Sequence, residues 1–182
     1  MENHSVEINL LRQVKAMVYL IGNNGSFPNN NLLPLLFYTQ VLSIQEGDDE
    51  TLEDLFRYNG WTGCHRNSIS GKHHYHSQAH ETLGVYQGYA RVQFGGPSGL
   101  IKTIHPGDVI IIPSGVAHKN LDSSPDFACV STYPEGQSFD LNYVPPKLSG
   151  YHEEKIKSTP LPKADPVFGK AGELLNYWRK LN

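Results

Sequence analysis

The sequence is poor in cysteine and lacks both long apolar runs and runs of basic residues. Its two cysteines, Cys64 and Cys129, are too few and too far apart to predict a disulfide scaffold or a four-cysteine zinc site. No apolar stretch approaches the roughly 18 residues of a membrane span. The first residues also lack a basic segment followed by an apolar core and a cleavage site. We therefore expect a cytoplasmic protein with reduced thiols and no membrane partner.

Neither sign of charge dominates the chain. Fifteen Lys and Arg face 18 Asp and Glu, which gives a formal net charge of −3. There is no basic run or basic helix face that could follow a row of phosphates, so we do not expect nucleic acid as a partner. The 182 residues, 38% of them hydrophobic, suffice for one sizeable core but are few for two. We expect a single domain over residues 1–182.

Strand patterns dominate the chain. Apolar, β-favouring runs occupy residues 16–21 and 36–44, and short runs alternate with Gly and Pro turns from residue 64 to about 133. One amphipathic helix is expected over residues 51–61. Residues 134–182 are rich in Pro and Lys, with a second short helix expected at 173–180, and have too little apolar surface for a core of their own. The pattern predicts an all-β sandwich or barrel with one short N-terminal helix and a C-terminal arm packed on it.

Four histidines and a glutamate lie within nine residues, from His73 to Glu81. Because side chains alternate along a strand, His74 and His76 share one face. The polar residues 77–80 predict a hairpin connection to a second strand. In that strand the alternate residues after Glu81 are apolar, which favours Glu81 over His80 as the inward side chain.

A fourth inward residue is expected from the segment 105–120. Its pattern predicts a turn at Gly107, a buried strand over 109–112, a second turn at 113–115 and a return to the sheet at His118. His118 can then point into the barrel beside the first group. Surface, turn or supporting roles are expected for the remaining histidines of this part of the chain, namely His65, His73, His80 and His105.

Both segments resemble the two motifs of the cupins. The first motif is matched by His74, His76, Glu81 and Gly88. Four residues separate His76 from Glu81, and six separate Glu81 from Gly88. The second is matched by Gly107, Pro113, Gly115 and His118. The core motifs span residues 68–122, and the departures fall at their two ends: Ser68 replaces a Gly and Asp122 an Asn. Both are turn or framework positions, so the departures concern local turn geometry more than metal binding.

Further stretches, including FPNN, YPEGQ and LPKADPVFG, resemble the bacterial YjlB-like cupins. The resemblance implies a double-stranded β-helix, or cupin jelly roll, with a metal site inside the barrel held by His74, His76, Glu81 and His118. Three imidazoles and a carboxylate suit Fe(II), Mn, Ni, Cu or Zn and leave coordination positions open. A structural zinc site is more often closed and rich in cysteine. The metal's identity and any catalytic residue beyond the ligands stay unassigned.

Three functions of different class follow from such a site. The first is a mononuclear metal enzyme, an oxygenase or isomerase of a small polar molecule; the second is a metal-dependent binding or sensing module without turnover. The third is a metal-free sugar-nucleotide epimerase, in which a histidine paired with a carboxylate is the base. We also expect a homodimer formed through the strand at 16–21. The expected apolar wall of the pocket is Leu83, Val85, Ile110, Ile112 and Val116.

Overall fold

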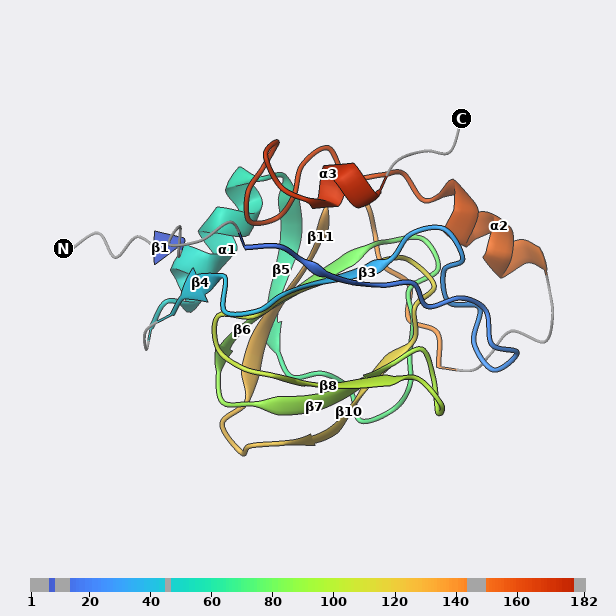
Figure 1. Ribbon diagram of the computed structural model, residues 1–182, viewed down its shortest axis with the longest axis horizontal. Coiled ribbons are helices and arrows are strands. Elements are labelled where there is room, and N and C mark those ends of the chain that lie inside the picture. The colour runs from blue at the N-terminus through green and yellow to red at the C-terminus, as the bar shows by residue number, and fades with distance from the viewer. Residues whose placement is uncertain (1–6, 9–13, 45–46, 144–149, 179–182) are drawn as a thin grey trace.

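Two antiparallel sheets that face each other form the frame of the protein (Figure 1). The computed structural model describes residues 7–8, 14–44, 47–143 and 150–178. In order across the larger sheet, the strands are β2 (Met17–Tyr19), β3 (Leu35–Tyr38), β9 (Val109–Ile112), β6 (Glu81–Gln87), β11 (Ala128–Pro134) and β5 (Trp61–Asn67). The smaller sheet contains β10 (His118–Ser123), β7 (Ala90–Phe94) and β8 (Leu100–Ile104). A separate pair joins β1 (Glu7–Ile8) to β4 (Leu42–Ser43). The expected all-β class is confirmed.

The larger sheet is buried on both faces at its centre. In β3, Leu35 and Phe37 join the core between the sheets, whereas Leu36 and Tyr38 join a second core on the outer face. The strand β9 divides its four apolar residues between the two cores in the same way. A strand covered on both sides needs apolar residues at every position. This explains why both segments are continuous apolar runs in the sequence.

Helices cover the outer face of the larger sheet. The helix α1 (Asp49–Tyr58) and the short helix α3 (Leu174–Tyr177) lie on the side away from the smaller sheet, and α2 (Gly150–Ser158) lies at one end (Figure 1). Leu52 and Phe56 of α1 are buried against β6 at Gly84, where a Cβ atom would lie 2.7 Å from the Phe56 ring. The absence of a side chain in β6 thus lets α1 pack closely.

The helices differ from the sequence-based expectation in two ways. The first helix begins at Asp49 and ends at Tyr58, so it starts two residues and ends three residues earlier than expected. The helix α2 was not expected at all. Of its described side chains only Ile156 is a buried apolar one, so no apolar stripe marks the helix in the sequence. Residues 144–149 and 179–182 of the expected arm lie outside the described residues.

The expected hairpin at residues 77–80 is wrong. The strand β6 pairs with β9 and β11, whereas His74 pairs with His118 at the start of β10. Residues 77–80 therefore carry the chain from one sheet to the other. The polar turn composition predicted the bend correctly but not the partner, because pairing between distant strands leaves no local signal.

Segment 159–178 is held on the outer face by buried polar contacts. The Tyr38 hydroxyl donates to Asp165 Oδ2 at 2.7 Å, and Asp165 Oδ1 accepts from the backbone N–H groups of Val167 and Phe168 at 2.9 and 3.0 Å. The indole N–H of Trp178 donates to the carbonyl of Pro34 at 2.8 Å.

None of the described helices has the length and apolar character needed to cross a membrane.

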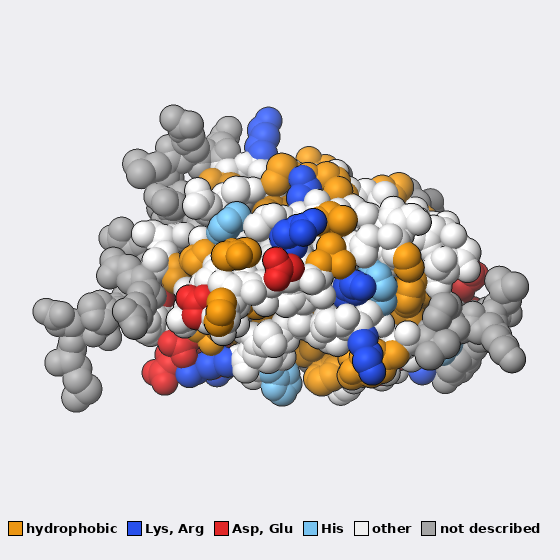
Figure 2. Space-filling model, turned by 90° about the horizontal axis from the view of Figure 1, so that it is seen from below, with side chains coloured by type: hydrophobic (Ala, Val, Ile, Leu, Met, Phe, Trp, Pro, Cys, Tyr) orange, Lys and Arg blue, Asp and Glu red, His pale blue; other side chains and the backbone are white. Residues whose placement is uncertain are grey.

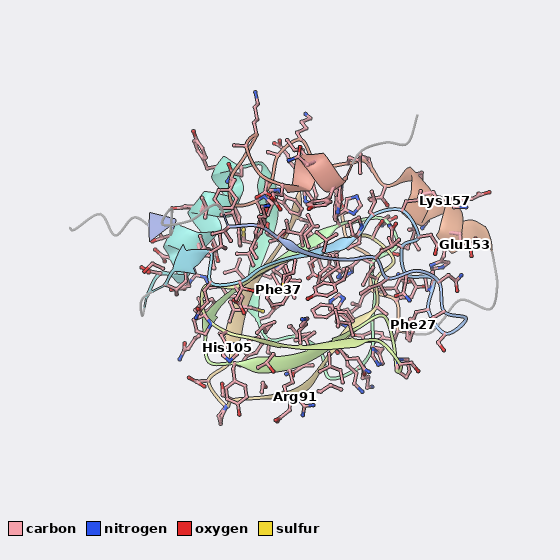
Figure 3. All side chains as sticks on the ribbon, viewed as in Figure 1. Phe27, Phe37, Arg91, His105, Glu153 and Lys157 are labelled. Atoms are coloured by element: carbon pink, nitrogen blue, oxygen red, sulfur yellow. The ribbon has the colours of Figure 1, made fainter. Side chains whose placement is uncertain are left out.

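The underside of the molecule carries side chains of mixed character. Figure 2 shows basic, acidic and apolar side chains interspersed over this face among the described residues. Arg91 and His105 are exposed, Arg91 below the smaller sheet and His105 at its left end, whereas Phe37 lies in the core between the sheets (Figure 3).

Candidate metal centre

Backbone pairing brings His74 and His118 together across the two segments. His74 N–H donates to the His118 carbonyl at 3.1 Å, and His118 N–H donates to the His74 carbonyl at 2.9 Å. Residues that exchange both hydrogen bonds stand directly opposite each other, with their side chains on the same face. The two ring centroids lie 4.2 Å apart. His76, two residues beyond His74, accepts a backbone hydrogen bond from Gly115 at 2.7 Å, which fixes this segment to the turn before His118.

Glu81 reaches the same point from the larger sheet. It begins β6, opposite Ile112 of β9. Its Oε2 atom lies 3.3 Å from His76 Nε2 and 3.1 Å from His118 Nε2. The candidate ligand atoms of His74, His76 and His118 all lie within 4.8 Å of one another, and all four residues are buried. The four side chains singled out in the sequence therefore converge between the two sheets.

Each histidine of the cluster is oriented by its own backbone contact. In all three, Nδ1 lies at hydrogen-bond distance from a carbonyl oxygen, so the ring N–H donates there and Nε2 stays free. The contacts are His74 to Lys72 at 3.1 Å, His76 to Asp140 at 2.5 Å and His118 to Val116 at 3.2 Å. A neutral imidazole with a free Nε2 is the form that binds a metal ion.

Burial and mutual charge set the protonation of the cluster. Burial, together with the neighbouring His118, lowers the pKa of His74 to about 3. Burial also lowers the pKa of His76, but the Glu81 carboxylate and Asp140 together raise it more, so the net shift is upward. The pKa of Glu81 is raised by burial, yet His76 and His118 together hold it well below its usual range. The carboxylate is therefore ionised, and it supplies the negative charge that a divalent ion would meet.

The donor set fits a divalent transition-metal ion. Buried His76 Nε2 and Glu81 Oε2 have no hydrogen-bond partner, although such atoms are normally satisfied. Two donors bound to one ion at about 2.1 Å and at right angles to each other lie about 3 Å apart. The separations of 3.1 and 3.3 Å match that value. Three imidazoles and one carboxylate are also a mixture that first-row transition metals accept.

The other histidines that were expected to have supporting roles do not belong to the cluster. His80 is fully buried on the outer face of the larger sheet, where its ring lies 4.6 Å from Trp178 and its Nδ1 accepts from Ser114 N–H at 3.0 Å. Burial lowers the pKa of His80 to about 3, so it is a neutral packing residue. His73 packs against Phe27, and His105 is exposed. His65 is also exposed, but it lines the cavity beside the cluster, with its ring 5.9 Å from that of Phe139 between centroids.

A cavity of about 420 Å³ opens from the four clustered side chains. Of the five apolar residues expected to line it, only Leu83 does so. Val85, Ile110, Ile112 and Val116 are buried in the core between the sheets instead. Strand parity predicted their inward direction correctly. It could not tell which inward residues pack against the facing sheet and which are left open, because that depends on the distance between the sheets.

Sequence reasoning missed several residues of the site. Tyr133 on β11 lies with its hydroxyl 3.3 Å from Glu81 Oε1, to which it donates. The segment after β11 supplies three wall residues, Phe139, Leu141 and Tyr143. Their alternation with Asp140 and Asn142 is an extended pattern that could have marked a strand-like wall in the sequence.

Comparison with known proteins agrees with this arrangement. The cupin family model matches residues 70–138, which include all four clustered residues. The uncharacterized protein YjlB of Bacillus subtilis (strain 168) is 35% identical over 166 residues, which cover 91% of this chain and 98% of the relative.

Similar solved structures include RmlC from Streptococcus suis in complex with dTDP-D-xylose, at 14% identity and a TM-score of 0.38, with 70% of this chain and 72% of that one covered. Procruciferin, an 11S globulin from Brassica napus, is 18% identical with a TM-score of 0.38, over 59% of this chain and 27% of its own. Likenesses this distant say nothing about activity. The family model and the extent of identity to YjlB do decide membership: the chain belongs to the cupins, among the YjlB-like proteins.

Proposed function

We propose that this protein is a mononuclear metal enzyme, an oxygenase or isomerase, and that His74, His76, Glu81 and His118 hold the ion. The observation that carries the proposal is the pair of buried atoms without a hydrogen-bond partner, His76 Nε2 and Glu81 Oε2, at the base of an open cavity. A purely structural ion would not need access to a cavity of this size. The metal, one of Fe(II), Mn, Ni, Cu or Zn, is set by supply as much as by the ligands.

The residues around the proposed ion have different roles. A bound ion would supply a Lewis acid for a coordinating substrate oxygen and, if redox-active, a centre for dioxygen chemistry. Tyr133 donates to Glu81 Oε1 and thereby leaves Oε2 directed at the histidines. Burial and the Glu81 carboxylate raise the pKa of Tyr133, so its hydroxyl stays protonated as a donor. The carbonyl of Asp140 holds His76 in its orientation.

Metal analysis tests the ligand assignment. We expect purified wild-type protein to bind about one equivalent of metal, and the His76→Ala, His118→Ala double variant to lose it, since removing two ligands weakens binding severely. His105→Ala is the matched control, because His105 is exposed and outside the cluster. Circular dichroism checks that each variant is folded. Near-stoichiometric metal in the folded double variant contradicts the assignment.

Turnover separates the enzyme from the alternative of a metal-dependent binding or sensing module. Protein loaded with Fe(II), Mn or Zn is given small diols, hydroxy acids, thiols and catechols while oxygen uptake and products are measured. An oxygenase consumes oxygen only with a redox-active ion, whereas an isomerase also works without oxygen. Uptake that is equal in the Glu81→Ala variant reflects free metal and contradicts an oxygenase. Saturable binding without turnover under any metal favours the sensing module.

The third hypothesis, a metal-free sugar-nucleotide epimerase, has less support. A His–carboxylate pair is present at 3.1 Å, but it forms part of a four-residue cluster with orphaned donor atoms. The diphosphate of a sugar nucleotide also needs cationic partners.

We further propose that the chain is one domain, with residues 134–182 as an arm on the barrel, and that it is a cytoplasmic protein.

We also propose a homodimer formed through β2. This strand is at the edge of the six-stranded sheet and has a partner only on its β3 side among the described strands. Met17, Val18 and Leu20 are 40, 37 and 62% exposed. An exposed apolar edge strand is a surface that proteins cover, and pairing with a second copy covers it.

A further inference from the structure

One wall of the metal cavity is formed by the segment that follows β11. Phe139, Leu141 and Tyr143 line the cavity and are each nearly half exposed, at 43, 47 and 46%. The alternate residues anchor the segment. The Asp140 carboxylate accepts from Ser77, and the Asn142 backbone exchanges two hydrogen bonds with Tyr75. In an extended segment, alternate side chains share a face, so the anchoring holds all three apolar residues toward the cavity. We call Phe139, Leu141 and Tyr143 the apolar wall.

Aromatic rings connect the apolar wall to the metal cluster. Phe139 stacks on Tyr133 with the ring centroids 4.7 Å apart and the planes inclined by 16°. His76 lies 5.5 Å from Phe139, and His74 lies 6.1 Å from Tyr143, both between ring centroids. A ligand bound to the ion would therefore extend across aromatic faces. Covering the half-exposed apolar surface around a cavity with an apolar group of a ligand lowers the free energy of the complex.

The cavity has no lysine or arginine free to bind an anionic group among the described residues that line it. Among the described residues that line it, Arg66 is the only Lys or Arg. Its guanidinium is committed to the acidic side of α1: it lies 2.5 Å from Asp49, 2.6 Å from Glu53 and 3.8 Å from Glu50. The buried Glu81 carboxylate adds negative charge at the base. A carboxylate or phosphate away from the ion would thus meet no free lysine or arginine and would lose hydration.

In place of the small polar molecule expected from the sequence, we propose a substrate that is polar only at one chelating end, which binds the ion, and is otherwise an uncharged, planar apolar molecule of about the size of a substituted benzene ring. The proposal rests on the proposed function, because the ion is the anchor for that end. We call the part of the substrate away from its chelating end the body. The apolar wall favours an apolar body, and the lack of a free lysine or arginine disfavours a body that carries an anionic group. The volume of about 420 Å³ lies at the lower end of the range for small-molecule sites, roughly 300–1,000 Å³.

Three hydroxamates with the same chelating end test the selection of the body. Protein loaded with Zn, which is redox-inert, is titrated by calorimetry with acetohydroxamate, benzohydroxamate and 4-carboxybenzohydroxamate. We expect benzohydroxamate to bind about tenfold or more tightly than acetohydroxamate, because its ring covers the apolar wall. The 4-carboxylate should weaken binding again by about tenfold or more, since its charge is unpaired. Equal dissociation constants for benzohydroxamate and either of the other two overturn the proposal.

Variants of the apolar wall locate the effect. Phe139→Ala should reduce the preference for benzohydroxamate over acetohydroxamate severalfold and leave acetohydroxamate binding unchanged. Tyr89→Ala is the matched control: Tyr89 is 42% exposed, and it does not line the cavity. It should leave the preference intact. A preference that survives Phe139→Ala, or falls equally in Tyr89→Ala, contradicts the role of the apolar wall.

Metal content, measured on the same samples, separates this inference from the proposed function. Protein that binds no metal contradicts the proposed function. The selection of the body is then tested without a chelating end, by NMR titration of metal-free protein with benzamide and 4-carbamoylbenzoate. Binding of benzamide that exceeds that of 4-carbamoylbenzoate and is lost in Phe139→Ala supports the selection. Equal binding of the two compounds, or no benzamide binding, overturns it.

Discussion

At the scale of single residues, Asp140 links the apolar wall to the metal cluster. Its carbonyl accepts from His76 Nδ1, and its carboxylate accepts from Ser77 N–H and Oγ–H at 2.7 and 2.5 Å, from Gln78 N–H at 3.3 Å and from Asn142 Nδ2 at 2.7 Å. Burial raises the pKa of Asp140, but the hydrogen bonds from Ser77 and Asn142 lower it more, so the net shift is downward. Asp140 thus connects the segment of the apolar wall to the segment that carries His76, through both its backbone carbonyl and its carboxylate.

This contact predicts a pH-dependent contribution to stability. A carboxyl whose pKa is lower in the folded state stabilises the fold above its unfolded pKa of about 3.9 and loses that contribution as pH falls through the folded value. We expect the free energy of unfolding of wild type to exceed that of Asp140→Asn at pH 7, and the difference to shrink below about pH 4. Urea unfolding at a series of pH values measures it. Asp126→Asn, at an exposed position, is the control. A difference that stays constant with pH contradicts the prediction.

At the scale of elements, the segment 159–178 depends on buried Asp165. Besides Tyr38, Val167 and Phe168, it accepts from Leu174 N–H at 3.3 Å, the first residue of α3. The segment also supplies Trp178, whose ring packs on His80. His80 in turn accepts from Ser114, in the turn that precedes His118. The outer layer therefore supports the turn that carries one of the proposed ligands.

Removing this acceptor should destabilise the protein strongly. Asp165→Ala leaves a buried hydroxyl and three backbone N–H groups without their partner, and we expect a loss of about 3 kcal/mol or more. Tyr38→Phe removes one donor to Asp165 and the acceptor of the Glu173 N–H group, and it should cost about 1–2 kcal/mol. Glu154→Ala, at an exposed position of α2, should change stability by less than about 0.5 kcal/mol. Urea unfolding measures all three, and a loss for Asp165→Ala no larger than for Glu154→Ala would rule out a structural role for this network.

At the scale of the whole molecule, the two edges of the larger sheet differ in character. The edge strand β2 of the larger sheet exposes apolar side chains in succession, whereas the opposite edge, β5, forms ion pairs with α1 through Arg66. Charged residues discourage edge-to-edge pairing, and apolar ones permit it. The asymmetry indicates which edge a second copy would use.

The dimer prediction is tested by charge placed on this edge. We expect a dimer mass for wild type by light scattering at tens of micromolar, and a monomer mass for the Val18→Lys, Leu20→Lys variant, because two lysines per chain would face each other across the pair. Tyr58→Lys is the control, since Tyr58 is 90% exposed on α1 and away from β2. A monomer mass for wild type refutes the homodimer. A dimer that persists in the double variant refutes this interface.

The sequence by itself determined the local parts of this protein. Alternation put His74 and His76 on one face, and the glycine at 115, whose φ is +89°, allowed the turn that returns the chain at His118. Such features depend on a few neighbouring dihedral angles, which leave a pattern in the residues themselves. The continuous apolar runs of β3 and β9 likewise record burial on both faces.

Only the tertiary structure decided what surrounds those residues. The partner of His74 is His118 rather than β6, and the apolar wall comes from a segment far along the chain, held by Asp140 against Ser77. The helix α2 has too few buried apolar residues to be recognised before it is packed. Pairings of this kind are selected by the summed packing of distant segments, to which each residue contributes little, so no local pattern encodes them.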